Sequence, residues 1–238
     1  MDAAAEAGFR VLPRRDFAAA LSDRSVDAVC VDTAAMVIDA CRAGKDVWME
    51  AMQAPVCGSI AEGRQMVEAA RRSRRVVQAG TFWRSSRPFQ EARRAVRHGE
   101  LGEVVFCRAF ESGECARPVH LMDLLQFTFD EAMPVSAAAQ GSCGNRQATF
   151  RYPAFVASYE SRGAGEPAIA FHGARATRIV SLREDSGLVD HWRNFLECIR
   201  SRRKPVSDIE TAVRSAATGR LMERALGSGT PVSFPREI

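Results

Sequence analysis

Short apolar runs alternate with amphipathic segments over the first hundred residues of the chain. Apolar runs at Val26–Val31, Val47–Met49 and Val76–Ala79 have the length and composition of buried strands. Helical patterns at Thr33–Ala43 and Ser59–Arg72 lie between them. This repeated order of strand and helix predicts a parallel sheet with right-handed crossover connections.

Local signals predict where the helices of this part begin and end. Gly44 stands where a helix C-terminal glycine is expected, and Lys45 with Asp46 is expected to form a polar turn. Ser59 and Glu62 have the spacing of a capping box. The remaining expectations are a helix-permissive start at Met1–Gly8, a strand at Phe9–Leu12, a helix from Asp16 to Leu21, a loop at Phe82–Pro88 and a helix at Phe89–His98.

The pattern changes after Gly102, where strand-like runs follow one another with few helices between them. The expected strands are Val104–Phe110, Val135–Gln140, Gln147–Arg151, Phe155–Ser161, Ala168–Phe171 and Thr177–Ser181. The expected helices are His120–Phe129, Leu188–Arg200 and Asp208–Leu226, the last followed by Gly227 as its C-terminal glycine. We therefore predict an α/β chain: a partial Rossmann-like parallel sheet domain over residues 1–102, then an α+β domain with an open, largely antiparallel sheet over residues 103–238.

Charge and composition exclude several classes of function. The hydrophobic content of 46% and charged content of 26% are those of an ordinary soluble globular protein. Arginine-rich runs occur at Arg71–Arg75 and Arg200–Lys204, within a net charge of +4. Each run ends a predicted helix, where cations complement the helix dipole, and neither is interleaved with aromatic residues. We therefore expect no nucleic-acid partner.

The cysteine pattern argues against metal sites and disulfides. Seven cysteines are scattered along the chain without CxxC or Cys/His ligand spacing. This usage suits a reducing compartment. No apolar stretch approaches the roughly 20 residues of a membrane span, and the first residues lack the order of a signal peptide. We expect a cytoplasmic protein with no metal and no membrane partner.

Several separate pieces of the sequence resemble the Gfo/Idh/MocA oxidoreductases. The first domain of that family is matched by VDAVCVDT, IDACRAGKDVWMEA and EGRQMVEAARRSRRVVQAGTFWRSS. The entry into its second domain is matched by GELGEVVFCRAF, and the likeness continues in VHLMDLLQF, FHGARAT and HWRNFLECIRSRRKPVSDIETAVRS. The resemblance spans most of residues 20–238, and the pieces occur in the order of the family.

This resemblance implies a Rossmann-type domain that binds NAD or NADP, followed by an open α/β sheet domain. It implies hydride transfer on a sugar-like or polyol small molecule, with the nicotinamide between the domains. It also implies a homo-oligomer formed through the open sheet.

The sequence departs from the family pattern in four places. The GxGxxG turn, the strand that precedes it in the family and the acidic residue that binds the ribose are all absent. The TP…H loop of the family is shortened at Asp32-Thr33. Ala51 occupies the place of the catalytic lysine of the EKP motif. Ala116 and Arg117 stand where the family commonly has an acid before its histidine. We interpret the chain as a truncated and motif-depleted relative.

Three residues are the candidates for a site. His120 matches the family's catalytic histidine, although its apolar neighbours also fit a packed histidine. Glu50 follows a strand at the sheet edge where ligands bind, and Arg84 lies at the same edge, so both are candidates for cofactor binding. Arg84 fits either a contact with an anion or a substrate hydroxyl, or a surface or interdomain salt bridge.

Two hypotheses follow from the sequence. The first is an NAD(P)-dependent sugar or polyol oxidoreductase with impaired or lost catalysis. The second is a non-catalytic binding or assembly subunit, or a fragment of a longer oxidoreductase.

Overall fold

The computed structural model describes residues 2–12, 16–50, 55–112, 118–142, 145–162, 166–183 and 186–234. The chain divides into two compact units, each made of two stretches of sequence. Unit 1 comprises Met1–Ser85 and Gly187–Val213, and unit 2 comprises Ser86–Ser186 and Arg214–Ile238. The predicted domain ranges 1–102 and 103–238 stay a prediction, since these units are discontinuous along the chain.

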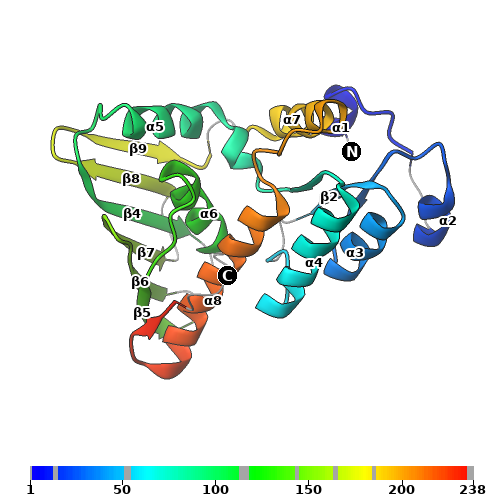
Figure 1. Cartoon of the computed structure of the whole chain (residues 1–238). Coiled ribbons are helices and arrows are strands. Elements are labelled where there is room, and N and C mark those ends of the chain that lie inside the picture. The colour runs from blue at the N-terminus through cyan, green and yellow to red at the C-terminus, as the bar shows by residue number, and fades with distance from the viewer. Residues whose placement is uncertain are drawn as a thin grey trace. The chain divides into compact units, whose positions relative to one another are not determined.

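Unit 1 contains a three-stranded parallel sheet in the order β1-β2-β3. Its strands are β1 (Ala28–Val31), β2 (Asp46–Met49) and β3 (Val77–Ala79). Its helices are α1 (Asp2–Glu6), α2 (Phe17–Ser22), α3 (Ala34–Arg42), α4 (Ile60–Ser73), the 3-10 helix η1 (Phe82–Ser85) and α7 (Leu188–Ser201). The predicted parallel sheet with helical crossovers is confirmed, and α3 and α4 lie side by side in Figure 1.

The predicted helix ends are largely confirmed in unit 1. Asp16 caps α2 by accepting a hydrogen bond from the amide of Ala19 at 3.1 Å. Ser59 caps α4 by accepting from the amide of Glu62 at 3.1 Å, and the Glu62 carboxylate accepts from the amide of Gly58. Gly44 follows α3 with φ of 75°, a left-handed conformation that glycine adopts without steric penalty.

Two local predictions for unit 1 are wrong. Residues 9–12 form no strand, because the ring of Phe9 packs against Trp192 at 5.5 Å and Phe195 at 5.7 Å between centroids. The expected polar turn at Lys45 and Asp46 is instead buried, at 8% and 1% exposure. The Lys45 ammonium donates to the carbonyl oxygens of Asp23 at 2.7 Å and Val26 at 2.8 Å, contacts that a local sequence pattern does not reveal.

The central strand of unit 1 is covered on both faces. All four residues of β2 are buried. Trp48 stacks on Trp192 of α7 with centroids 3.5 Å apart, and its side chain is 1% exposed. Because side chains alternate along a strand, Val47 and Met49 point to the opposite face, and α3 packs against this strand. Cover on both faces is what a parallel sheet requires.

Unit 2 is built on a seven-stranded sheet in the order β10-β5-β6-β7-β4-β8-β9. The strands are β4 (Val104–Ser112), β5 (Ser136–Ser142), β6 (Asn145–Arg151), β7 (Val156–Arg162), β8 (Ala168–Gly173), β9 (Thr177–Ser181) and β10 (Val232–Ser233). Only the pairing of β4 with β7 is parallel among the described strand pairs of this sheet, so the predicted largely antiparallel sheet is confirmed.

Three helices accompany this sheet: α5 (Arg87–Arg97), α6 (Pro118–Thr128) and α8 (Ile209–Ser228), whose first residues belong to unit 1. α5 contacts β9 and α6 (Figure 1). Two predicted ends are wrong. α5 begins before Phe89 because Pro88 fits the first helical turn, and α8 continues past Gly227 to Ser228, after which Gly229 has φ of 64°. The predicted loop at Phe82–Pro88 holds η1 and the start of α5.

The sheet of unit 2 has one buried and one open face. The buried face holds Cys107, Ala109, Ala148, Phe150, Ala157, Tyr159, Ile169, Phe171 and Val180. The alternate residues lie on the other face, where Arg108 is in register with Ala170 and Ala170 with Ile179. Ile179 is 69% exposed there. Among the described residues no helix is long and apolar enough to cross a membrane.

Candidate functional site

The carboxyl ends of the three parallel strands form the edge where a ligand is expected in unit 1. The amide of Glu50 donates to the carbonyl oxygen of Val31 at 2.7 Å, and the amide of Gly80 donates to that of Met49 at 2.8 Å. These bonds extend the ladder by one residue and hold Glu50 at the edge, with its side chain half-buried. Ala51, at the position of the family's lysine, lies outside the described residues.

Arg84 lies in η1, directly beyond the end of β3, and its side chain is fully buried. Its Nη1 donates to the carbonyl oxygen of Val206 at 3.3 Å. The neighbouring Ser207 carbonyl accepts from the amide of Ala79 at 2.8 Å, so the segment before α8 runs beside β3. The guanidinium therefore bonds to this segment inside unit 1, a contact that neither sequence alternative included.

His191 of α7 is also fully buried at the end of β3. Its Nε2 lies 2.8 Å from the carbonyl oxygen of Ala79 and must donate, because a carbonyl only accepts. Its Nδ1 lies 2.7 Å from the hydroxyl of Ser85, and its own carbonyl accepts from the Gln78 amide at 2.8 Å. His191 thus packs onto the sheet of unit 1, and both of its ring nitrogens are bound within that unit.

The helix N-termini at this edge test whether unit 1 fits the pyrophosphate of a dinucleotide. A pyrophosphate binds where free amides at a helix N-terminus point at it. The Thr33 hydroxyl accepts from the amide of Met36 at the start of α3, and α4 is capped by Ser59 and by the Glu62 carboxylate. Each cap bonds one of the amides that a phosphate could use, and the Glu62 carboxylate adds a negative charge beside α4. Both features disfavour a pyrophosphate at these described helix N-termini.

His120 and Asp123 lie on one face of α6 in unit 2, as their spacing predicts. His120 is 7% exposed and Asp123 is 1% exposed. The Ser215 hydroxyl of α8 donates to Asp123 Oδ1 at 2.7 Å.

A buried polar chain continues from Asp123 between α6 and α8. The Ser215 hydroxyl is also 2.8 Å from Gln126 Oε1, and its one proton serves one of the two acceptors at a time. Gln126 Nε2 donates to the Thr218 hydroxyl at 2.7 Å. Ser215 and Thr218 were not singled out from the sequence, since nothing in their local pattern places them beside α6. Ala116 and Arg117 lie outside the described residues.

His98 and His172 lie at a helix end and in a strand pair of unit 2. His98 is the C-terminal cap of α5, as expected. His172 lies 3.2 Å from the Thr177 hydroxyl through Nδ1, across the β8–β9 pair. Over the part of the chain that the structure describes, no group of three His, Cys, Asp or Glu residues is placed to hold a metal ion.

Comparison with known sequences gives no relative. No family model and no curated protein significantly matches the chain.

Comparison with solved structures gives many dehydrogenases. The myo-inositol 2-dehydrogenase of Lactobacillus plantarum matches with a TM-score of 0.82 at 14% identity, over 93% of this chain and 84% of that one. The scyllo-inositol dehydrogenase of Lactobacillus casei, solved with NAD(H) and scyllo-inositol, matches with a TM-score of 0.82 at 12% identity, over 92% and 84%. The WlbA dehydrogenase of Bordetella pertussis, in complex with NADH and UDP-GlcNAcA, matches with a TM-score of 0.79 at 18% identity, over 98% and 87%.

At these identities the likeness establishes the fold alone. It confirms the architecture that the sequence resemblance implied, a small parallel sheet followed by a larger, mostly antiparallel one. The chain has the fold of the Gfo/Idh/MocA-type inositol and sugar dehydrogenases.

Proposed function

We propose that this protein is a relative of the NAD(P)-dependent sugar and polyol dehydrogenases in which hydride transfer is impaired or lost. The fold supports the relationship, and two solved proteins of this fold hold NADH or NAD(H) with a sugar-like ligand. The proposed partner is a small molecule of that kind, an inositol or a sugar derivative.

The capped helix N-termini of α3 and α4 are the observation that carries the proposal. A hydride donor or acceptor must be held before it reacts, and much of the affinity for a dinucleotide comes from its phosphates. Thr33, Ser59 and Glu62 bond those amides themselves. The sequence supports the same conclusion through Ala51, which stands in place of the family's lysine.

The proposed roles of the candidate residues differ in unit 1 and unit 2. His120 is the proposed catalytic residue for any turnover that survives, with Asp123 beside it on α6. Glu50 is the proposed cofactor-facing residue, because its half-buried side chain stays at the strand end. We propose Arg84 as a positioning residue, since its guanidinium is buried and bonded to the carbonyl of Val206.

Titration of the purified full chain with NADH and NADPH, followed by nicotinamide fluorescence, tests the proposal. We expect no saturable binding at concentrations that saturate an active dehydrogenase of this fold, which serves as the positive control. We also expect the variant Ala51→Lys to show no turnover of myo-inositol or scyllo-inositol with NAD. Tight binding of either dinucleotide, or turnover of either inositol by the unmodified chain, would refute the proposed loss.

An assembly role is the second candidate, and the open face of the unit 2 sheet favours it. Ile179 is 69% exposed on β9, and the Arg108–Glu160 ion pair of 3.0 Å lies on the same face, on β4 and β7 beyond β8. An exposed apolar side chain on a sheet face is a common feature of subunit contacts. We propose that a second copy of this chain covers that face.

The oligomeric state in solution tests the assembly role. We expect the unmodified protein to sediment as an oligomer and Ile179→Lys to sediment as a monomer. Val135→Lys is the matched control, because Val135 is 40% exposed and precedes β5. A monomeric unmodified protein, or equal dissociation by both substitutions, would rule out this interface.

A further inference from the structure

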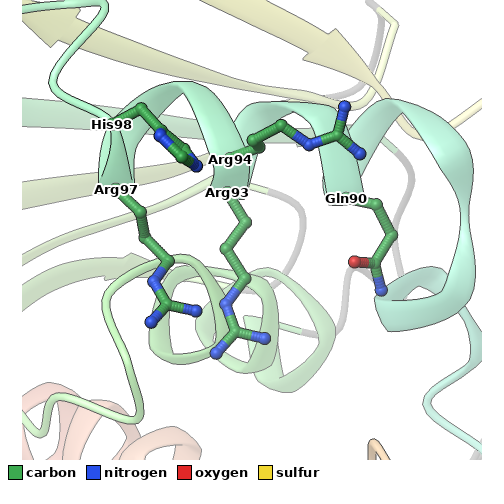
Figure 2. A pocket seen from close by; sticks show the side chains of 5 residues that line it. All are labelled: Gln90, Arg93, Arg94, Arg97 and His98. Atoms are coloured by element: carbon green, nitrogen blue, oxygen red, sulfur yellow. The ribbon is translucent and has the colours of Figure 1, made fainter.

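One face of α5 lines an open pocket of about 490 Å³ in unit 2 (Figure 2). The lining residues are Gln90, Arg93, Arg94, Arg97 and His98. Their spacing along the helix places them on a single face. Three of the five are arginines and none is a carboxylate, so the pocket has a strongly cationic lining.

Arg93 is held in place on this face before any ligand arrives. Its guanidinium carbon lies 4.4 Å from the centroid of the Phe127 ring, a cation–π contact. Its Nη2 lies 3.0 Å from Asp130 Oδ1, and its side chain is only 26% exposed. A guanidinium fixed in this way loses less conformational entropy when it binds a ligand.

Asp130 also ties Arg97 into the cluster. Arg97 Nε lies 3.6 Å from Asp130 Oδ2, so one carboxylate is shared by two guanidinium groups. Asp130 and Glu131 have φ of 51° and 64°, a left-handed turn that directly follows α6. Arg94 forms no ion pair within the described residues, which leaves the three arginines with more positive charge than Asp130 neutralises.

The helix dipole alone does not account for this arrangement. Cations near a helix C-terminus are favourable, and that explains why arginine is tolerated in the last turns of α5. It does not require their side chains to border one pocket. In Figure 2 the side chains of Arg93 and Arg97 extend to the same side of the helix, and that of Arg94 extends toward Gln90.

We propose that this pocket binds a small phosphorylated molecule through its phosphate or diphosphate group. Guanidinium groups bind phosphate oxygens through paired, charge-assisted hydrogen bonds. A volume of about 490 Å³ suits a small-molecule ligand. The lining offers three guanidinium groups, one amide and the imidazole of His98, and no aliphatic side chain, so the anionic group is what it recognises. This proposal does not rest on the proposed dehydrogenase function, and the two can fail separately, because phosphate binding is tested without a nicotinamide or a sugar.

Calorimetric titration of the full chain with inorganic pyrophosphate at low salt tests the proposal. We expect saturable binding at one site, weakened about tenfold or more in Arg94→Gln and in Arg97→Gln, since each removes charge-assisted hydrogen bonds. Arg151→Gln is the matched control: Arg151 is exposed on β6, on the open face of the sheet, and its loss should leave the affinity unchanged.

Three results would overturn the proposal. The first is the absence of saturable heat with pyrophosphate. The second is equal weakening by R94Q and R151Q, which would indicate non-specific attraction to a basic protein. The third is tighter binding of citrate than of pyrophosphate, which would assign the pocket to carboxylates. All three arginine variants alter exposed side chains, so their melting temperatures should stay at that of the unmodified protein.

Discussion

The two sheets of this protein are stabilised in different ways. The parallel sheet of unit 1 is fixed by contacts from a segment more than a hundred residues later in the chain. Arg202 binds Asp46, His191 binds Ala79 and Ser207 binds the same strand end. In the sheet of unit 2, three of the six described pairings join strands that follow one another: β5 with β6, β6 with β7 and β8 with β9.

The difference shows in burial along the strands. All four residues of β2 are buried, whereas β6 and β8 alternate between buried and exposed or half-buried positions. A strand that is covered on both faces is stabilised by packing partners on each face. A strand with one open face has such partners on its buried face only. Substitutions in unit 1 should therefore have larger effects on stability than equivalent ones on the open face of unit 2.

The largest expected effect is that of Trp48→Ala. Trp48 is 1% exposed and contacts Trp192, Phe195 and His191, so its removal leaves a large cavity. We expect unit 1 to lose about 3–5 kcal/mol of unfolding free energy. All three tryptophans of the chain lie in unit 1, so denaturation followed by the fluorescence of the remaining two reports on this unit.

Phe106→Ala is the matched aromatic substitution on the open face of unit 2. Phe106 is half-buried and stacks on His172 with centroids 5.5 Å apart. We expect a loss of about 1 kcal/mol of unfolding free energy, because Phe106 buries less apolar area than Trp48 does. Denaturation followed by far-ultraviolet circular dichroism measures this loss. Equal losses from W48A and F106A would contradict the contrast between the two sheets.

Asp46→Ala should have the next largest effect. Asp46 is 1% exposed, and its carboxylate accepts from Arg202 at 2.8 and 2.9 Å and from the amide of Val76 at 2.9 Å. Its loss leaves the Val76 amide without that acceptor, so we expect unit 1 to lose about 2–3 kcal/mol. The Arg202 side chain is 50% exposed and can be solvated, which keeps the effect below that of a fully buried ion pair.

Asp39→Ala is the control for the charge change. Asp39 pairs with Arg42 at 3.4 Å on the surface of α3, with side-chain exposures of 54% and 75%. Exposed pairs of this kind contribute little, so we expect a change within about 0.5 kcal/mol. A D39A loss as large as that of D46A would mean that net charge, and not the buried contact, sets the stability.

The sequence predicts the elements of both units well and their tertiary contacts poorly. Periodicity and capping residues such as Ser59 define α4 closely, because these signals act within one helical turn. Lys45 was expected at a polar surface and is 8% exposed, because its partners are carbonyls about twenty residues earlier. Phe9 was expected in a strand and instead packs on α7.

The candidate site shows the same limit. His120 and Asp123 were placed on one helix face from their spacing, which the structure confirms. The partner of Asp123 is Ser215, 92 residues away, and no local pattern connects the two. The arginines of α5 were not singled out, since the sequence does not show that Asp130 and Phe127 lie beside Arg93.

A third prediction concerns alkaline pH and the buried face of unit 2. Burial raises the pKa of the Cys107 thiol from 9.0 to about 12. The folded state thus favours the neutral thiol, and this contribution to stability is complete below pH 9 and is lost as the pH rises toward 12. One pH unit above the unfolded value, the unmodified protein should have lost about 1.4 kcal/mol more than Cys107→Ala, relative to pH 7.

Urea denaturation of both proteins at neutral and alkaline pH measures this difference. Burial also raises the pKa of Tyr152 and of Tyr159, and this cause is present in both proteins. Cys107 adds a second, smaller upward shift to the pKa of Tyr152 in the unmodified protein only. The volume lost in C107A lowers stability equally at both pH values. Parallel pH profiles for the two proteins would show that the Cys107 thiol ionises in the folded state as easily as in the unfolded one.

The smallest expected effect is that of Ile179→Ala, compared with Val180→Ala at the next position of β9. Val180 is 3% exposed on the buried face and its truncation should remove about 2 kcal/mol, whereas Ile179 is 69% exposed and should lose less than about 0.5 kcal/mol. This holds for the single chain at low protein concentration. If a second copy covers the open face, the loss for I179A grows with protein concentration, because association stabilises the folded state by mass action. Denaturation at two protein concentrations separates these outcomes: a concentration-dependent I179A effect with an unchanged V180A effect locates the subunit contact on the open face, and two concentration-independent effects exclude it.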